Sequence, residues 1–303
     1  MGADLLVRGA VGLARRANVP PIVVALTLVA LGTSLPELVV SVQAVFQGYP
    51  GIVLGNVVGS NIANVLLVAG VSAIVYPLAF PGGSVRRDAL VMILASAVFF
   101  LLCLADSLSR FVGAALLLGL VGFMVPTVKE AARTSQEAGP RAPLEIVLGL
   151  PTRRPVIILF LVSGVIGLPV GARLVVDAAV FFAEALKIPE AVVGVTIIAF
   201  STSLPELATT IVAALRRETE VALGTLVGSN IFNILAIIGF SALVAPSGIP
   251  VPAGFAYLDL PLMMVSALLI SSFIWLRRPI GRKAGVFLTS VYVAYLVVLF
   301  VRG

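Results

Sequence analysis

Long apolar segments separated by short polar breaks make up most of this chain. Windows long enough to cross a bilayer predict ten membrane segments. The most polar stretch, residues 127–154, divides them into two groups of five. The approximate ranges are 3–17, 20–47, 52–77, 87–105, 109–126, 155–186, 190–215, 221–245, 256–276 and 283–301.

This pattern predicts an all-α polytopic membrane protein. We expect a first repeat over residues 1–126, a linker over 127–154 and a second repeat over 155–303. Because each repeat has an odd number of segments, the second one enters the membrane from the opposite side. The ten transmembrane helices should therefore form two inverted five-helix repeats, with broken helices at the midplane.

The basic residues indicate how the chain is oriented. Fifteen of the 20 Lys and Arg residues fall in loops on one side of the predicted membrane, the side of the linker. The positive-inside rule then places the linker in the cytoplasm and the C-terminus outside. We expect an integral protein of the plasma (inner) membrane.

The first segment is shorter than its counterpart. Met1 aligns with Val170 of the second repeat, which continues upstream through apolar residues 155–169. We therefore expect the N-terminal helix to be incomplete, with the natural chain starting upstream. A short, tilted first helix is the alternative.

Composition narrows the choice of function. Hydrophobic residues make up 60% of the chain and charged residues 11%, with a mean hydropathy of +1.17, which excludes an ordinary soluble protein. There is no histidine, and Cys103 is the single cysteine, so histidine or cysteine metal sites and an internal disulfide are excluded. The net charge of +6 fits the positive-inside bias, and we expect no nucleic-acid partner.

One polar signature occurs twice within the apolar sequence. The segment 32–38, GTSLPEL, returns at 201–207 as STSLPEL. The segment 55–64, GNVVGSNIAN, returns at 224–233 as GTLVGSNIFN. Both pairs are offset by 169 residues, so the two copies occupy matching places in the two predicted repeats.

The first motif places a carboxylate beside a helix-breaking proline. Glu37 and Glu206 directly follow Pro36 and Pro205. A carboxylate inside a membrane segment costs roughly 2.5–3.5 kcal/mol on insertion scales and so indicates function. Proline frees carbonyl oxygens in the preceding turn. Carboxylate, carbonyl and hydroxyl oxygens suit Ca²⁺ and Na⁺. The alternative, a structural kink with a buried glutamate, is disfavoured because the motif occurs twice.

The second motif predicts a polar helix face near the glutamates. Ser60 and Asn64 are four residues apart, as are Ser229 and Asn233, so each pair shares a helix face. Glycines four residues apart precede each pair and allow another helix to approach closely, although such spacing alone more often marks simple helix packing.

Together these motifs resemble the alpha-repeats of sodium/calcium exchangers, within the cation/Ca²⁺ antiporter superfamily, prokaryotic type. The resemblance implies a Ca²⁺ site at the midplane, flanked by Na⁺ sites. The implied Ca²⁺ ligands are Glu37, Glu206, Thr33 and Thr202. The implied Na⁺ ligands are Ala30, Ser34, Glu37, Ser60, Asn64, Ala199, Thr202, Ser203, Glu206, Ser229 and Asn233.

The chain departs from this family at Asn233, where many members carry Asp. An amide keeps an oxygen ligand but cannot ionise or carry a proton. The resemblance implies exchange of Na⁺ for Ca²⁺ by alternating access as the expected function. An H⁺-coupled exchanger, or an exchanger of another divalent cation, is the alternative.

Two other function classes are disfavoured. An intramembrane metal-dependent enzyme would need a nucleophile and a base that two glutamates without histidine do not supply. A protein that binds Na⁺ or Ca²⁺ without transporting it is a third possibility. We expect no enzyme activity, no cofactor and no obligatory protein partner. Ca²⁺ and Na⁺ are the expected substrates, and the lipid bilayer surrounds the chain.

Overall fold

The structure is a computed structural model. It describes residues 2–48, 51–79, 84–137, 151–185, 203–251, 255 and 257–302. The described chain is almost entirely helical. In the first half a helix bends at the proline motif, and each half contains a helix interrupted by a π-helical turn.

The first half contains, in order, α1 (Gly2–Arg16), α2 (Pro21–Val24), η1 (Ala25–Val29), α3 (Ala30–Thr33), α4 (Leu35–Phe46), α5 (Gly51–Ala63), η2 (Asn64–Val68), α6 (Ala69–Val75), α7 (Ser84–Leu102), β1 (Ser107–Leu108) and α8 (Arg110–Glu137). The second half contains α9 (Arg154–Ala185), α12 (Leu204–Leu215), α13 (Thr219–Phe232), η4 (Asn233–Ile238), α14 (Gly239–Val244), β2 (Ile249–Pro250), α15 (Asp259–Trp275) and α16 (Arg282–Arg302).

The helices agree with a membrane protein, but they do not by themselves establish ten spans. Within the described residues, four helices are long and apolar enough to cross a bilayer: Ile52–Val75, Arg110–Glu130, Thr219–Val244 and Arg282–Leu299. A fifth span results if the bent pair Pro21–Thr33 and Leu35–Phe46 is counted as one. The number ten therefore stays a prediction.

One predicted boundary differs from the observed helix. The fifth segment was expected to end at residue 126, but α8 continues through Pro126 to Glu137. The first part of the predicted linker is therefore helical. Arg87 on α7 contacts this extension, because it forms an ion pair with Glu130 and donates a hydrogen bond of 3.0 Å to Thr127 Oγ1.

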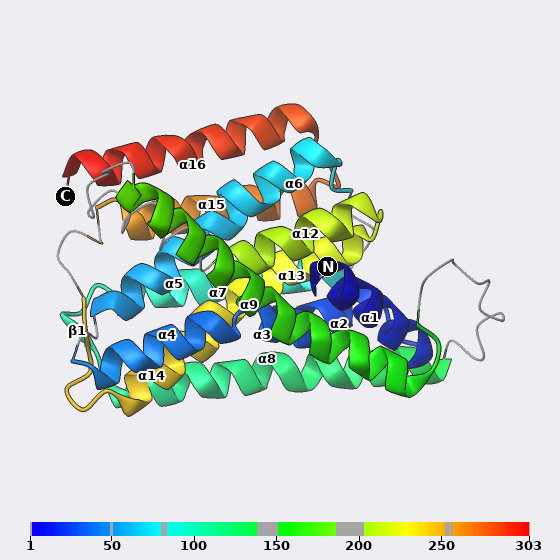
Figure 1. Ribbon diagram of the computed structural model, residues 1–303. Coiled ribbons are helices and arrows are strands. Elements are labelled where there is room, and N and C mark those ends of the chain that lie inside the picture. The colour runs from blue at the N-terminus through cyan, green and yellow to red at the C-terminus, as the bar shows by residue number, and fades with distance from the viewer. Residues whose placement is uncertain are drawn as a thin grey trace.

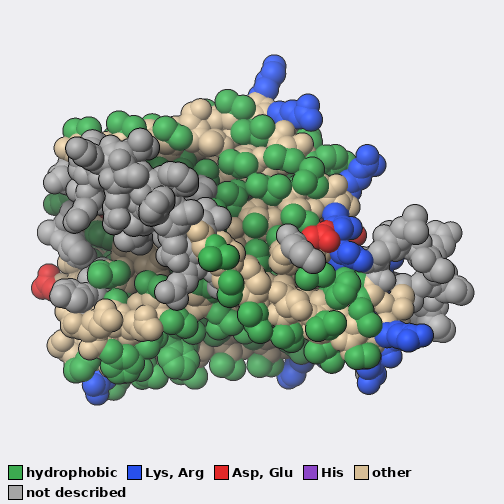
Figure 2. Space-filling model, in the orientation of Figure 1, with side chains coloured by type: hydrophobic (Ala, Val, Ile, Leu, Met, Phe, Trp, Pro, Cys, Tyr) green, Lys and Arg blue, Asp and Glu red, His purple; other side chains and the backbone are tan. Residues whose placement is uncertain are grey.

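The helices form a buried centre with a lipid-facing periphery. The apolar window of Thr219–Val244 is 100% buried and that of Ile52–Val75 is 83% buried, against 22% for both Arg110–Glu130 and Arg282–Leu299. In Figure 1, α13 lies in the middle, while α8 and α16 run along opposite edges. Hydrophobic side chains cover much of the face in Figure 2, as expected of a surface in contact with lipid.

Short strand-like contacts join the two halves at both ends of the molecule. Leu108 pairs with Ile249 in the β1–β2 ladder, and Leu78 forms a bridge with Ile280. Leu78 and Ile249 lie in corresponding connections of the two halves, as do Leu108 and Ile280. The β1 strand lies at one end of the molecule, and the end of α6 and start of α16 lie at the other (Figure 1). Such reciprocal pairing is what a two-fold relation between the halves produces.

Helix α1 packs against the first half of α9 through glycines. A Cβ atom on Gly164 would lie 2.6 Å from the Cβ and 2.8 Å from the Cα of Leu6. Gly9 approaches Leu161 in the same way. The two helices lie side by side in Figure 1 and share an apolar cluster that is separate from the main core. Asp4 on α1 also accepts a hydrogen bond of 2.6 Å from Nε of Arg216, directly after α12.

This close approach makes a testable prediction. Gly164→Ala should destabilise the protein by about 1–3 kcal/mol, because the new methyl group overlaps the α1 backbone. Gly167→Ala on the same helix is the matched control, since the nearest atom to its Cβ would be Gly2 Cα at 3.7 Å. Thermal unfolding in detergent compares the two, and equal melting temperatures for both variants would contradict the packing described here.

Candidate functional site

The serine ahead of each proline has the same backbone geometry in both motif copies. Ser34 has φ −87° and ψ 1°, and Ser203 has φ −90° and ψ 2°. A helix starts directly after each serine, since the Leu38 amide donates to the Ser34 carbonyl at 3.1 Å and the Leu207 amide to the Ser203 carbonyl at 2.9 Å. In the first copy the two arms are bent by 41°. Each glutamate lies in the first turn of the helix that starts there, at its positive end.

Both glutamates are buried where the halves meet. Each is 1% exposed. Glu206 Oε1 accepts hydrogen bonds from Ser34 Oγ at 3.3 Å and from Ser229 Oγ at 3.4 Å. Ser34 belongs to the first half, so this carboxylate bridges the repeats.

Thr33 joins the same group of oxygens. Its Oγ1 donates to the Ala30 carbonyl at 3.2 Å and lies 3.4 Å from Ser229 Oγ. The carbonyl, both hydroxyls and the Glu206 carboxylate are therefore linked by consecutive short contacts.

Several other buried oxygens at this site have no hydrogen-bond partner among the described residues. They are Glu37 Oε1 and Oε2, Glu206 Oε2, Ser203 Oγ, Asn64 Oδ1 and Asn233 Oδ1. Buried carboxylates without compensating partners are costly, and a cation would provide that compensation. No three His, Cys, Asp or Glu side chains cluster in the described part of the chain. A cation here would therefore complete its shell with hydroxyl, amide and carbonyl oxygens, which suits Na⁺ and Ca²⁺.

A reciprocal pair of amide contacts lies beside the glutamates. Asn64 Nδ2 donates to Asn230 Oδ1 at 3.3 Å, and Asn233 Nδ2 donates to Asn61 Oδ1 at 3.0 Å. Asn61 and Asn230 are related by the 169-residue offset, as are Asn64 and Asn233. Asn64 and Asn233 are also the first residues of the π-helical turns η2 and η4.

Two methionines, on α7 and α15, contact two of the same asparagines. Asn230 Nδ2 lies 3.5 Å from Met92 Sδ on α7, and Asn61 Nδ2 lies 3.9 Å from Met263 Sδ on α15. The amide group thus ties the two central helices to each other and to α7 and α15.

The structure brings most of the predicted site residues together in this buried region. Direct contacts join Ala30, Thr33, Ser34, Glu206 and Ser229, and amide contacts hold Asn64 and Asn233. Glu37, Ser60 and Ser203 are buried as well. Ala199 and Thr202 lie outside the described residues. Sequence reasoning missed the roles of Asn61, Asn230, Met92 and Met263. The repeat carried a signal for the two asparagines, because Gly-Ser-Asn occurs in both motif copies.

The glycine spacing in the second motif is a packing feature, at least in the second half. A Cβ on Gly224 would lie 2.6 Å from Ala25 Cβ, and one on Gly228 would lie 2.7 Å from Ala30 Cβ. The absence of side chains therefore lets α13 lie against the broken helix that carries Thr33 and Ser34.

A sequence profile of the family described as "Sodium/calcium exchanger protein" matches residues 1–128 and 156–301. This chain belongs to the sodium/calcium exchanger family. This match confirms the resemblance inferred from the two motifs. The family consists of membrane transporters rather than enzymes.

Three curated relatives match over nearly their whole length. "Putative antiporter CaxA" of Alkalimonas amylolytica is 37% identical, over 98% of this chain and 94% of the relative. "Inner membrane protein YrbG" of Escherichia coli (strain K12) is 36% identical, over 98% and 92%. "Sodium/calcium exchanger MaX1" of Methanosarcina acetivorans is 33% identical, over 99% and 94%.

Solved structures of the sodium-calcium exchanger NCX_Mj share the fold. The one soaked with zero Na⁺ and Ca²⁺ is 32% identical and superposes with a TM-score of 0.82, covering 98% of this chain and 94% of that chain. The one soaked with 100 mM Na⁺ and 10 mM Sr²⁺ has a TM-score of 0.83 at 31% identity, covering 98% and 93%.

The reciprocal amide contacts predict paired effects on stability. Asn61→Ala leaves the Asn233 amide without its acceptor, and Asn230→Ala does the same to Asn64. Each should lower the free energy of unfolding by about 1–3 kcal/mol, the cost of a buried polar group left unpaired. The measurement is thermal unfolding of the purified protein in detergent.

Ser266→Ala is the control for this pair. Ser266 on α15 is buried, and its hydroxyl has no hydrogen-bond partner within the described chain. A loss of stability in Ser266→Ala as large as in the two asparagine variants would count against a specific role for the amide contacts.

Proposed function

We propose that this protein exchanges Na⁺ for Ca²⁺ across the membrane, by alternating access at a site built on Glu37 and Glu206. The observation that supports this most is the burial of two carboxylates, one from each half, among hydroxyl, amide and carbonyl oxygens in the centre of an apolar protein. Such an intramembrane pair needs cations for compensation, and Na⁺ and Ca²⁺ are the cations that such oxygens prefer.

In this proposal both glutamates coordinate Ca²⁺ together with Thr33 and Thr202. The Na⁺ ions share these glutamates and use the neighbouring neutral oxygens. The proposed neutral ligands for Na⁺ are Ala30, Ser34, Ser60, Asn64, Ala199, Thr202, Ser203, Ser229 and Asn233. Because the ligands are shared, one Ca²⁺ and a full set of Na⁺ exclude each other.

Charge then couples the two fluxes. Two ionised carboxylates balance one Ca²⁺ or two Na⁺, and a third Na⁺ would add net charge. A loaded site can pass the apolar barrier because its carboxylates are compensated, whereas an empty site leaves two buried charges. The protein without bound ions should therefore not switch its site from one side of the membrane to the other, so transport occurs only as exchange.

The two halves are proposed to be inverted repeats of five helices, with the α8–α9 linker in the cytoplasm, the C-terminus outside and the chain in the plasma (inner) membrane. The reciprocal contacts of Leu78 with Ile280 and of Leu108 with Ile249 support a two-fold relation. The lysines and arginines support the orientation, since most blue side chains in Figure 2 lie toward the end where α8 ends and α9 begins.

Transport by proteoliposomes tests this function. Vesicles loaded with Na⁺ and diluted into Na⁺-free buffer should take up ⁴⁵Ca²⁺, and Glu206→Gln should reduce uptake to background because the shared ligand charge is lost. Glu130→Gln is the control, since it removes a carboxylate that pairs with Arg87 away from the site. Normal uptake by a folded Glu206→Gln protein would refute the proposal. Ca²⁺ binding without uptake in the wild type would indicate a binding protein.

The amide at Asn233 leaves open which ion drives Ca²⁺ transport, and this alternative can be tested. An H⁺-coupled exchanger, or one for another divalent cation, could use the same glutamates. We expect wild-type uptake to depend on internal Na⁺ and not on a pH gradient. Asn233→Asp should add a steeper loss of uptake at low pH, because its carboxylate can bind a proton where the amide cannot.

Asn233→Ala is the matched control, since it loses the same hydrogen bond to Asn61 without adding an acid. Uptake is measured over a series of pH values at a fixed Na⁺ gradient. If a pH gradient alone drives uptake by the wild type, the coupling ion is H⁺ and not Na⁺.

A further inference from the structure

A pocket lies where α1 ends and α9 begins, away from the buried glutamates. Its volume is about 290 Å³. Three of its residues come from the end of α1 and the residue after it, and three from the first turns of α9. They are Leu13, Arg16, Ala17, Arg154, Ile157 and Ile158.

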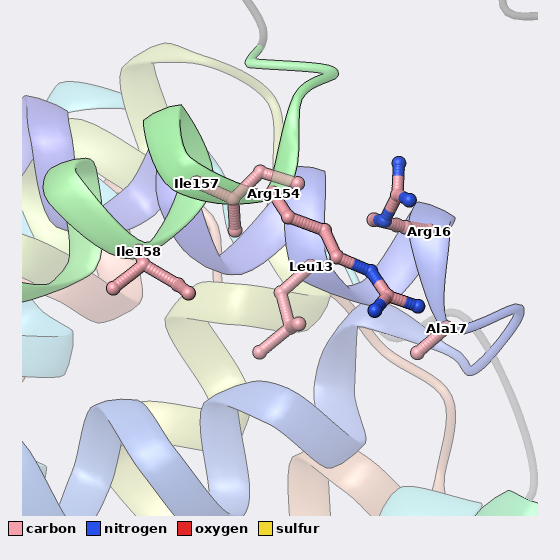
Figure 3. A pocket seen from close by; sticks show the side chains of 6 residues that line it. All are labelled: Leu13, Arg16, Ala17, Arg154, Ile157 and Ile158. Atoms are coloured by element: carbon pink, nitrogen blue, oxygen red, sulfur yellow. The ribbon is translucent and has the colours of Figure 1, made fainter.

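The pocket has a charged side and an apolar side. Figure 3 shows the guanidinium groups of Arg16 and Arg154 toward one side, with Ile157 and Ile158 on the other and Leu13 between. Both arginines are exposed. Arg16 Nη1 donates to the Thr152 carbonyl at 3.1 Å, which leaves its other N–H groups available for an acceptor. Within the described ranges, no ion pair joins either arginine to an acidic side chain.

The pocket lies at the border between the apolar sides of the protein and its arginine-rich end. Ile158 is 59% exposed and Leu159 is 60% exposed, which places the first turns of α9 against lipid. Arg15 and Arg153 stand next to the two pocket arginines in the chain, which adds basic residues to this end of α1 and α9. A basic pocket between membrane helices at this level is suited to a lipid headgroup.

We propose that this pocket binds one anionic phospholipid. Arg16 and Arg154 would hold the headgroup phosphate, and an acyl chain would lie along Leu13 and Ile158 toward the bilayer. Charge complementarity selects an anion, and the apolar wall selects one that carries a hydrocarbon chain. The pocket is smaller than a whole phospholipid, so the rest of the molecule lies in the surrounding bilayer.

Such a lipid would connect α1 to α9. These helices already touch through the glycine contacts and the bond from Arg16 to the Thr152 carbonyl. A phosphate held between Arg16 and Arg154 adds an ionic link where α1 ends and α9 begins. The proposal rests on membrane placement and on this geometry, and it does not depend on which ion is exchanged.

Lipid binding by the purified full chain tests the proposal. Native mass spectrometry in detergent measures the fraction carrying one bound lipid during titration with dioleoyl phosphatidylglycerol or dioleoyl phosphatidylcholine. We expect the wild type to bind phosphatidylglycerol more tightly. Arg16→Gln/Arg154→Gln should weaken that binding by about 10- to 30-fold, from the usual contribution of a basic residue near an anionic lipid surface.

Two further variants separate the parts of the site. Ile158→Trp fills the apolar wall, keeps both arginines and should also weaken phosphatidylglycerol binding. Arg278→Gln/Lys283→Gln removes two exposed charges elsewhere and should leave binding unchanged. Since Ile158 is already exposed, its variant keeps the proposal testable if the double arginine variant does not fold, which circular dichroism checks.

Three results would overturn the proposal. The first is equal wild-type affinity for the two lipids, and the second is an equal loss in the Arg278→Gln/Lys283→Gln control, which would indicate general electrostatics. The third is a combination of two observations: millimolar glycerol 3-phosphate or inorganic phosphate displaces phosphatidylglycerol, and Ile158→Trp binds as well as the wild type. That result would make the pocket a site for small soluble anions.

Discussion

The burial of two carboxylates in the centre of an apolar protein is the constraint on which the rest of this structure depends. A charge at this depth costs several kcal/mol unless it is compensated. The central helices therefore carry polar side chains directly beside Glu37 and Glu206, while the peripheral helices are apolar and face lipid. Hydroxyl donors cover one oxygen of Glu206, and the other carboxylate oxygens have no protein donor in the described chain. Protein groups thus supply only part of the compensation, and cations supply the remainder in the function proposed here.

The backbone of the two halves is more symmetric than the hydrogen bonding of their side chains. Ser34 and Ser203 have nearly the same φ and ψ, yet Ser34 donates to Glu206 whereas the Ser203 hydroxyl has no partner within the described residues. The two halves thus share one backbone scaffold but differ in which serine hydroxyl bonds to a glutamate. The reciprocal asparagine contacts, by contrast, obey the symmetry.

The sequence could predict which polar residues are buried together better than it could predict the lengths of the helices. The repeated motifs identified the glutamates and their hydroxyl neighbours, because a polar group is costly in a membrane segment and therefore stands out. Hydropathy could not predict the end of α8, since it measures contact with lipid and not helix length. Residues 127–137 are too polar for the bilayer but are good helix formers, and Arg87 fixes them through Thr127 and Glu130. The π-helical turns had no signal in the sequence, and the methionine contacts depend on how α7 and α15 cross the centre.

The packing of α1 against α9 differs in kind from its packing against the centre. Hydrocarbon tails are as apolar as leucine, so helices in a bilayer associate through close packing and polar contacts. Between α1 and α9 the backbones come together at Gly164 and Gly9, which joins the two helices firmly. Toward the centre, the same pair presents aliphatic side chains to Val24 and Val29, and Asp4 bonds to Arg216. The pair also approaches the broken helix of the first motif closely, since a Cβ on Gly32 would lie 2.8 Å from Val165 Cγ2 of α9. The α1–α9 pair is therefore joined within itself by backbone contacts and borders the motif that carries Glu37, so any change in its position bears directly on the surroundings of the buried carboxylates.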